Sequence, residues 1–189
     1  MSAPTPLMPR QAVPNVSVPL VGGGTWSLAD QKPENFTMLV VYRGLHCPIC
    51  KGYLNDLQSR LEAFAKHGVT AVAMSSDDQE RAERTKADWG LDALPLGYGL
   101  TLQQGRALGL YISSGRGKTS IGVEEPDLFV EPGLFLIRPD QTLYFGSVQT
   151  MPFARPHFAE IEGALGFVLQ KDYPARGEVV DIPPAVAAE

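Results

Sequence analysis

Several kinds of residue are scarce in this sequence, and each shortage narrows what the protein can be. Cysteine occurs twice and histidine three times in 189 residues, so a structural zinc site, which needs four ligands, has few side chains available. No stretch approaches the ~20 apolar residues of a membrane-spanning helix. The 16 basic residues are outnumbered by 21 acidic ones, and the net charge of −5 argues against nucleic acid or an anionic membrane as the main partner.

The first residues do not show the pattern expected of a secretion signal. The segment 1–14 holds four prolines where a signal peptide needs an uninterrupted apolar core. We therefore expect the protein in the cytoplasm. In that compartment a Cys-x-x-Cys pair is more often catalytic than structural.

What remains is the composition of one folded domain. Apolar residues make up 44% of the chain and charged residues 20%, which suits a single domain with a filled core. We place this domain over residues 15–171. The arm at 1–14 is expected to be extended or disordered unless it packs on a partner, and the tail at 172–189 to wrap the domain or to pair with a neighbour in a homodimer.

The most informative stretch is 38–57, in which an apolar run leads into both cysteines and then into a helical pattern. A helix N-terminus carries unpaired N–H groups and a partial positive charge of about half a unit. His46 adjoins Cys47 in sequence, and Arg43 lies four residues before it. Together these groups favour the thiolate of Cys47, whose pKa falls in such motifs from about 8.5 to roughly 3.5–7.5.

The spacing of the two cysteines suits a redox cycle. Pro48 can occupy an early helical position without wasting a donor, which places Cys50 one turn further along. From there its sulfur can attack a mixed disulfide on Cys47. We assign Cys47 as the exposed nucleophile and Cys50 as the more buried resolving thiol.

Other interpretations of the pair remain open. Zinc would need two further ligands, and the sequence offers only His46, His67 and His157, the last two in distant segments. A structural disulfide closing so short a loop would remove little chain entropy. Two inert buried thiols are the third alternative, since free cysteine is a common core residue.

Apolar patterns predict the rest of the fold. Residues 16–30 resemble a hairpin with Gly22–Gly24 as the turn and with Trp26 and Leu28 returning to the core. Runs of apolar residues and their periods predict the remaining strands over 37–42, 69–74, 94–98, 132–138 and 142–146, and helices over 48–67, 79–90, 102–110 and 155–171. The first of these strands is apolar throughout, as expected for a central strand buried on both faces.

Two polar stretches invite a ligand-binding interpretation. Residues 75–78, Ser-Ser-Asp-Asp, are either cation ligands or the cap and first-turn acids of the following helix, and we favour the cap. The stretch 113–127 contains Gly117-Lys118-Thr119, but a Walker A loop needs glycine where Ile112 stands. We expect a mobile surface loop there that shapes access to the cysteines.

The closing helix is predicted over 155–171, with Pro156 in its first turn. Arg155 would stand at the start of this helix. It either approaches the cysteines or is an exposed arginine flanking a helix, and we favour the exposed position.

The segment 40–54, VVYRGLHCPICKGYL, resembles the active-site segment of thioredoxin-fold proteins, and more closely the peroxiredoxin-like branch of the AhpC/TSA (alkyl hydroperoxide reductase/thiol-specific antioxidant) family. Three later stretches support the resemblance: Pro132 with GLFLIR after it, FARPHFAEIEGAL at 153–165, and DYPARGE at 172–178. It implies an α/β fold of thioredoxin-like type, three α/β/α layers around a central mixed sheet, with an N-terminal hairpin and a C-terminal helix.

The chain departs from the peroxiredoxin pattern at three positions. Gly44 occupies the place of the family's hydroxyl residue and Val40 the place of its proline. Pro132 stands where the family has a peroxide-binding arginine, a role that Arg43 or Arg155 would have to fill. Pro132 instead resembles the cis-proline that faces the Cys-x-x-Cys of thioredoxins and leaves neighbouring backbone free to pair with an extended substrate.

The favoured function is therefore thiol–disulfide oxidoreductase, with Cys47, Cys50, His46, Arg43 and Pro132 as the candidate catalytic residues. The resemblance implies thioredoxin or glutathione as the reductant, a disulfide or a peroxide as the substrate, and no cofactor. A true thiol peroxidase and a redox-inert binding module on the same scaffold are the alternatives.

Overall fold

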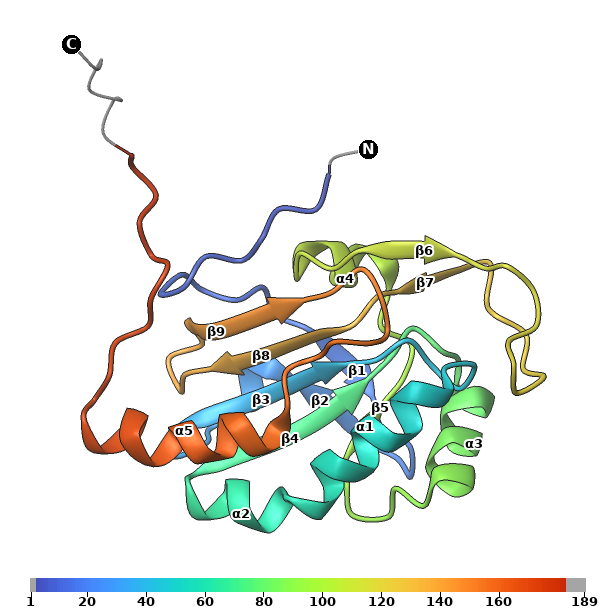
Figure 1. Cartoon of the computed structure of the whole chain (residues 1–189), viewed down its shortest axis with the longest axis horizontal. Helices are drawn as coiled ribbons and strands as arrows, with labels where there is room; N and C mark the ends of the chain where they lie inside the picture. The colour runs from blue at the N-terminus through green and yellow to red at the C-terminus, as the bar shows by residue number, and fades with distance from the viewer. Residues whose placement is uncertain (1–2, 183–189) are drawn as a thin grey trace.

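The computed structural model describes residues 3–182, and its centre is a five-stranded mixed sheet (Figure 1). The strand order is β5-β4-β3-β8-β9, with β3 parallel to β4 and antiparallel to β8. β9 forms one edge, antiparallel to β8. The strands are β3 Phe36–Val41, β4 Val69–Met74, β5 Leu96–Gly97, β8 Gly133–Ile137 and β9 Leu143–Val148. The mixed sheet predicted from the sequence is confirmed.

β3 occupies the middle of the sheet because it is apolar on both sides. All six of its residues are buried. Phe36, Met38 and Val40 belong to the core on one face, whereas Leu39 and Val41 belong to the core on the other. The expectation of a central strand buried on both faces is confirmed.

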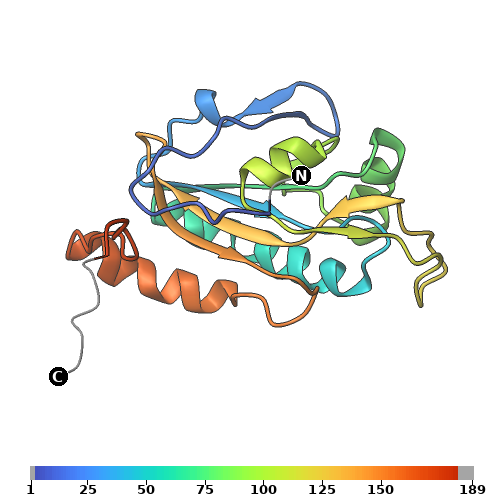
Figure 2. The ribbon, with the colours of Figure 1, turned by 90° about the horizontal axis from the view of Figure 1, so that it is seen from above.

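One face of the sheet is covered by α1 (Pro48–Ser59), α2 (Leu61–Lys66) and α5 (Phe158–Gln170) (Figure 2). α3 (Gln79–Trp89) lies beside α1, and its Trp89 packs in the core under these helices. These helices form the first outer layer, and the start of α1 is brought to the end of β3.

The opposite face carries the second outer layer (Figure 2). It consists of the hairpin of β1 (Ser17–Pro19) and β2 (Thr25–Ser27), the short 3₁₀ helix η1 (Leu28–Asp30), and α4 (Leu102–Ala107). Trp26 and Leu28 are buried in the core on this face, as the sequence predicts. The three-layer α/β/α architecture is confirmed.

A β-ribbon extends beyond the sheet on the right of Figure 1. β6 (Ile112–Ser114) pairs antiparallel with β7 (Leu128–Val130). Lys118 and Glu124 form a further isolated bridge within the connecting segment. The stretch expected as a surface loop, 113–127, therefore begins in a paired strand and folds back on itself.

The helix expected over 48–67 is two helices in the structure, α1 and α2, and this expectation of a single helix is wrong. The chain leaves helical geometry at Arg60, with φ −106° and ψ 2°. At this break the Arg60 guanidinium donates to Asp56 at 2.8 Å and to Glu162 of α5 at 3.0 Å. The side chain thereby connects two helices of the same layer.

The closing helix begins later than expected. α5 starts at Phe158, with His157 as its N-cap, so both Arg155 and Pro156 precede it. The residue before a proline avoids the helical region, which explains why Arg155 is left in the connecting segment. The expected place of Pro156 in the first helical turn is wrong. The buried side chains of α5 include Phe158 and Leu165, as the period predicts.

The N-terminal arm and the C-terminal tail both pack against the domain. The backbone N–H of Arg10 donates to a carbonyl of β9 at 2.8 Å. The guanidinium of Arg10 donates to the Ala175 carbonyl at 3.1 and 2.9 Å and pairs with Glu178 at 3.2 Å. The tail thus contacts the arm as far as Glu178, and the arm packs on its own chain, whereas Val179, Val180 and Ile182 of the tail are exposed. Residues 1–2 and 183–189 of these two segments lie outside the described residues.

No helix within residues 3–182 combines the length and the apolar character that a membrane crossing requires. The expected homodimer and the expected cytoplasmic location are separate matters, and both stay predictions.

Candidate active site

Cys47 and Cys50 lie at the start of α1 and form a disulfide, with their Cα atoms 5.3 Å apart. Cys47 is the N-cap, in extended geometry, and Pro48 takes the first helical position. The Cys50 N–H donates to the Cys47 carbonyl at 3.0 Å, which closes the first turn around the two sulfurs. The junction of strand and helix predicted from the sequence brings the cysteines together as expected.

Both cysteines are buried in this disulfide form. Cys47 is 2% exposed and Cys50 is 0% exposed, so Cys47 is not the exposed thiol that the sequence predicts. Ile49 between them is 49% exposed, which puts the turn itself at the surface. The sulfurs lie just beneath this turn, within the core that the long helices cover.

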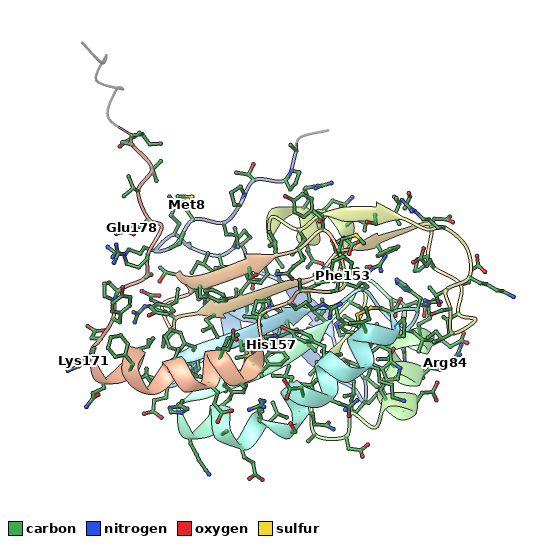
Figure 3. The ribbon with its side chains drawn as sticks, in the orientation of Figure 1. Met8, Arg84, Phe153, His157, Lys171 and Glu178 are labelled. Carbon is green, nitrogen blue, oxygen red and sulfur yellow. A yellow bond between two sulfur atoms is a disulfide. The ribbon has the colours of Figure 1, made fainter. Side chains whose placement is uncertain are left out.

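Arg155 supplies the cation at the sulfurs. Its Nη2 donates to Cys50 Sγ at 3.0 Å and approaches Cys47 Sγ at 3.8 Å. The residue is only 8% exposed, so the favoured expectation of an exposed helix-flanking arginine is wrong. Figure 3 labels Phe153 and His157, which flank Arg155 on the segment joining β9 to α5. This segment passes close to the start of α1.

Tyr53 of α1 holds this segment in place. Its hydroxyl donates to the Pro156 carbonyl at 3.0 Å, and its ring lies under the Arg155 guanidinium, 4.9 Å from ring centre to Cζ. Burial lowers the pKa of Arg155 to about 10, so the side chain still carries its charge at neutral pH. No acceptor among residues 3–182 bonds its Nε or Nη1, so the N–H groups of these two buried nitrogens have no partner.

Arg43 is directed to a different set of partners. Its Nε lies 3.4 Å from a Glu131 carboxylate oxygen and its Nη2 3.5 Å from one of Glu125, and its Cζ lies 4.7 Å from the centre of the Phe129 ring. Two carboxylates therefore balance its charge. The expectation that Arg43 favours the Cys47 thiolate is not supported by these contacts.

His46 is buried and electrically neutral. It is 0% exposed, its ring meets the edge of Phe129 at 4.6 Å between centroids, and its Nδ1 lies 3.4 Å from Nη2 of Arg81. Burial, helped by the charges of Arg43 and Arg81, lowers the pKa of His46 to about 3. His46 therefore brings no positive charge to Cys47 at neutral pH, and that part of the prediction is wrong.

This low pKa predicts a pH-dependent stability. His46 takes up its proton near pH 6.5 in the unfolded chain but only near 3 in the folded one. The free energy of unfolding should therefore fall by up to about 1.4 kcal/mol per pH unit as the pH drops from 6.5 towards 3. Urea unfolding at a series of pH values measures this slope in the wild type and in His46→Gln.

The control for that series is His157→Gln, which removes an exposed histidine. We expect this variant to keep the wild-type slope, whereas His46→Gln should have a shallower one. Equal slopes in the wild type and in His46→Gln would contradict the assignment of a neutral, buried imidazole.

Asp77 positions the loop that leads to the cysteines. Its Oδ2 accepts the Leu45 N–H at 2.7 Å, and its Oδ1 accepts from Nε of Arg81 at 2.9 Å. Gly44 has φ +129°, and a Cβ there would lie 2.6 Å from both carboxylate oxygens. Glycine at this position is thus required by Asp77, which explains why the family's hydroxyl residue is absent.

The stretch 75–78 has two functions rather than one. Asp78 caps α3, accepting the Arg81 N–H at 2.9 Å, as favoured from the sequence. Asp77 instead binds the Leu45 N–H described above, a contact that no local pattern indicates. Among residues 3–182, no group of three or more His, Cys, Asp or Glu side chains is placed to hold a metal ion.

Pro132 does not have the geometry expected of it. No peptide bond among the described residues is cis. The Pro132 carbonyl accepts the Gln149 N–H at 3.0 Å, and the Glu131 N–H donates to the Tyr111 carbonyl at 2.8 Å. The backbone on both sides of Pro132 is therefore already paired within the protein. The cis geometry expected of Pro132 is wrong, whereas its role in docking an extended substrate stays a prediction.

Comparisons with known proteins bear on the family and the fold of this chain. A family model described as the AhpC/TSA family matches residues 9–145. No curated protein matches the sequence. Three solved structures with the same fold are peroxidoxin BcpB of Mycobacterium tuberculosis, peroxiredoxin 6 of Arenicola marina and PrxQ of Xylella fastidiosa.

The likeness to these structures extends over most of each chain. The first has a TM-score of 0.66 and 17% identity, covering 86% of this chain and 98% of that one. The second has a TM-score of 0.68 and 20% identity, covering 96% and 86%. The third has a TM-score of 0.65 and 17% identity, covering 89% and 99%. At these identities the structures establish the shared fold.

Proposed function

Because the chain belongs to the AhpC/TSA family, whose members are thiol-dependent oxidoreductases, we propose that it reduces disulfides by cycling Cys47 and Cys50 between dithiol and disulfide. The family match confirms the resemblance predicted from residues 40–54. The oxidoreductase class follows from the family, and the proposal concerns the substrate and the order of steps.

The contact of Arg155 with both sulfurs carries the proposal. A buried guanidinium 3.0 Å from Cys50 Sγ and 3.8 Å from Cys47 Sγ stabilises a thiolate on either sulfur. The N–H groups at the start of α1 add to this at Cys47. A pair of thiols meant only to fill the core would gain nothing from a buried positive charge.

The proposed cycle moves two electrons from the pair to the substrate. The Cys47 thiolate attacks one sulfur of a substrate disulfide, and the other substrate sulfur leaves as a thiolate that takes a proton from water. The Cys50 thiolate then attacks Cys47 Sγ, which closes the Cys47–Cys50 bond and releases the second substrate thiolate. A reductant must afterwards return two electrons to the pair.

Hydroperoxide reduction is the second candidate function. Nε and Nη1 of Arg155 have no acceptor among residues 3–182, so they are available to the oxygen that leaves when Cys47 attacks a peroxide. That attack gives a sulfenic acid and an alcohol or water, and Cys50 condenses with the sulfenic acid to form the disulfide and water. Gly44 and Val40, in place of the family's hydroxyl and proline, favour disulfides as the main substrate.

The reductant and the location are part of the proposal. Thioredoxin or glutathione would regenerate the dithiol, and both suit the reducing cytoplasm that the sequence predicts. Cell fractionation followed by immunoblotting tests the location.

The function is tested by mixing the reduced protein with an oxidant in a stopped-flow instrument and measuring the rate of its oxidation. The oxidants are insulin, as the disulfide, and hydrogen peroxide and cumene hydroperoxide, as the peroxides. The rate with each oxidant is compared with the rate for free cysteine, the reference thiol. Acid quench, alkylation and mass spectrometry measure the fraction of Cys47–Cys50 disulfide. We expect insulin to be reduced with a rate constant at least about 100-fold above that of the free thiol, since the positioned thiolate is the reactive form.

The outcomes separate the two candidate functions. A peroxide rate constant equal to that of free cysteine eliminates the peroxidase function. A peroxide rate constant far above the insulin one makes peroxide the main substrate. If no oxidant closes the Cys47–Cys50 bond faster than it oxidises free cysteine, the proposed function is wrong.

A further inference from the structure

Tyr53 contacts the segment before α5 at three places. Its hydroxyl donates to the Pro156 carbonyl at 3.0 Å. The centre of its ring lies 4.9 Å from Cζ of Arg155. The same ring packs against that of Phe158, the first residue of α5, with 4.4 Å between the centroids. One side chain of α1 therefore contacts three of the four residues from Arg155 to Phe158.

Tyr53 and Cys50 lie on one face of α1, because they are three residues apart on the same helix. Arg155 contacts both of them, since its Nη2 lies 3.0 Å from Cys50 Sγ while its Cζ faces the Tyr53 ring. Cys47 Sγ is further from the same Nη2, at 3.8 Å. The guanidinium therefore lies nearer to Cys50 than to Cys47.

The hydroxyl of Tyr53 does not titrate in the range in which the thiols do. Burial raises the pKa of Tyr53, and the charge of Arg155 only partly opposes this effect. The phenol thus stays protonated and continues to donate to the Pro156 carbonyl. A change in the titration of either thiol can therefore be measured without a change in this contact.

We propose that Tyr53 is a positioning residue that keeps the Arg155 guanidinium on Cys50 Sγ and thereby makes Cys50 the better leaving group when the Cys47–Cys50 disulfide is opened. The inference rests on the proposed function and concerns its regeneration step. Without the ring and the anchored carbonyl, the guanidinium would be free to turn from the buried sulfurs towards water, where it is better solvated. A thiol of lower pKa leaves faster, so a cation nearer to Cys50 directs the attack of a reductant to Cys47.

The step balances with one molecule of a dithiol. A thiolate of the dithiol attacks Cys47 Sγ and forms a new S–S bond there. The Cys47–Cys50 bond breaks, and its electron pair leaves with Cys50 beside Arg155 Nη2. The second thiolate of the dithiol then attacks the sulfur that is bound to Cys47, which closes the cyclic disulfide and releases the Cys47 thiolate. One dithiol is oxidised, one protein disulfide is reduced, and two protons pass through water to the cysteines.

Tyr144 is a matched control within the same chain. Its hydroxyl also donates to a backbone carbonyl, that of Tyr173, at 3.0 Å. The centre of its ring also lies 4.9 Å from Cζ of an arginine, Arg138. Tyr144 belongs to β9 at the edge of the sheet, and Tyr173 follows the end of α5, whereas Arg155 precedes the start of that helix (Figure 1). The control thus has the same kinds of contact at the other end of α5.

The test measures the rate at which dithiothreitol reduces the oxidised protein, by acid quench and free-thiol titration. The variants are Tyr53→Phe, Tyr53→Leu, the same two changes at Tyr144, and Tyr53→Leu combined with Arg155→Gln. The thiolates are measured separately in Cys47→Ser and Cys50→Ser, each with and without Tyr53→Leu. The ultraviolet absorbance of the thiolate against pH gives the titration midpoint and needs no reagent to reach a buried sulfur.

We expect Tyr53→Phe to lower the reduction rate about threefold, since it loses one hydrogen bond. Tyr53→Leu should lower it about tenfold, since the ring under the guanidinium is lost as well. In the Arg155→Gln background the same change should alter the rate by less than about twofold, because the residue through which Tyr53 acts is gone. The titration midpoint of Cys50 should rise by about one pH unit in Tyr53→Leu, and that of Cys47 by less. Both Tyr144 variants should stay within about twofold of the wild-type rate.

The inference and the proposed function fail in distinguishable ways. If Tyr53→Leu slows reduction by the same factor with Arg155 and with Arg155→Gln, Tyr53 supports α1 itself, and the inference is wrong while the function stands. The same follows if the midpoint of Cys47 shifts as much as that of Cys50. Where Tyr53→Leu does not fold, Tyr53→Phe decides, and a wild-type rate in that variant overturns the inference. If the wild-type disulfide neither opens with dithiothreitol nor forms again with any oxidant, the redox cycle itself is wrong.

Discussion

A Cys47→Ser variant is expected to lose at least about 10³-fold of the rate at which the reduced protein opens insulin disulfides, because removing the nucleophile removes the step that forms the mixed disulfide. Cys50→Ser should keep that first step and stop after it. The mixed disulfide on Cys47 then accumulates and is seen by intact-protein mass spectrometry as a stable adduct. After peroxide treatment, the same variant should carry a sulfenic acid on Cys47.

The pair of variants also tests the order of the cysteines. Arg155 Nη2 is closer to Cys50 Sγ, at 3.0 Å, than to Cys47 Sγ, at 3.8 Å. Cys47, in turn, is the N-cap of α1 and lies at the positive end of the helix. If Cys47→Ser traps the adduct and Cys50→Ser does not, Cys50 is the nucleophile and our assignment is reversed. Ile49→Ala serves as the control, since it alters the exposed residue between the cysteines and keeps both sulfurs.

The same experiment tests the alternative of a redox-inert binding module. Such a protein would leave insulin disulfides intact in the wild type and would bind its partners equally well as Cys47→Ser. Rapid reduction by the wild type, lost in Cys47→Ser, excludes that alternative.

The parts of the site that follow from the sequence are local. The end of β3, the two cysteines and the start of α1 lie within a single stretch of chain, so an apolar run, a proline and a helical period are enough to predict them. Predicting the central mixed sheet required the family resemblance in addition to this pattern, and the strand order β5-β4-β3-β8-β9 comes from the structure alone. The parallel pairing of β3 with β4 follows because a helical segment connects them.

The parts that do not follow depend on tertiary contacts. Arg155 lies 108 positions from Cys47, and only the folded connection between β9 and α5 brings it to the sulfurs. Its position before a proline was the one local signal, since that residue is excluded from the helix and left free to turn inward. The sequence predicts Asp77 to be one of several residues that cap the following helix. In the structure its carboxylate instead accepts the N–H of Leu45.

His46 shows why a residue's neighbours in sequence are a poor guide to its charge. Adjacency to Cys47 suggests a cation, but the ring is directed against Phe129 and is fully buried, which keeps it neutral. Arg43 likewise has the right spacing and the wrong partners, because Glu125 and Glu131 come to it from the ribbon. Spacing places the backbone, whereas burial and pairing decide which side chain carries the charge.

Replacing Arg155 with glutamine should lower the rate of insulin reduction by about 10²–10³-fold, the loss typical of removing one positioned donor from a developing anion. The cause is the loss of the guanidinium that contacts both sulfurs, so the thiolate form becomes less favourable. Arg155→Lys should recover part of the rate, since it keeps the charge but has one donor nitrogen in place of three.

Alkylation of Cys47 by iodoacetamide in the Cys50→Ser background, followed against pH, measures the thiolate directly. We expect the alkylation rate to reach half its maximum at a higher pH in Arg155→Gln than in the protein that keeps Arg155. The control is Arg84→Gln, which removes an exposed arginine of α3 and should leave this pH unchanged. A wild-type alkylation profile in Arg155→Gln would mean that the guanidinium packs on Tyr53 as a structural group, and that the start of α1 alone activates the thiol.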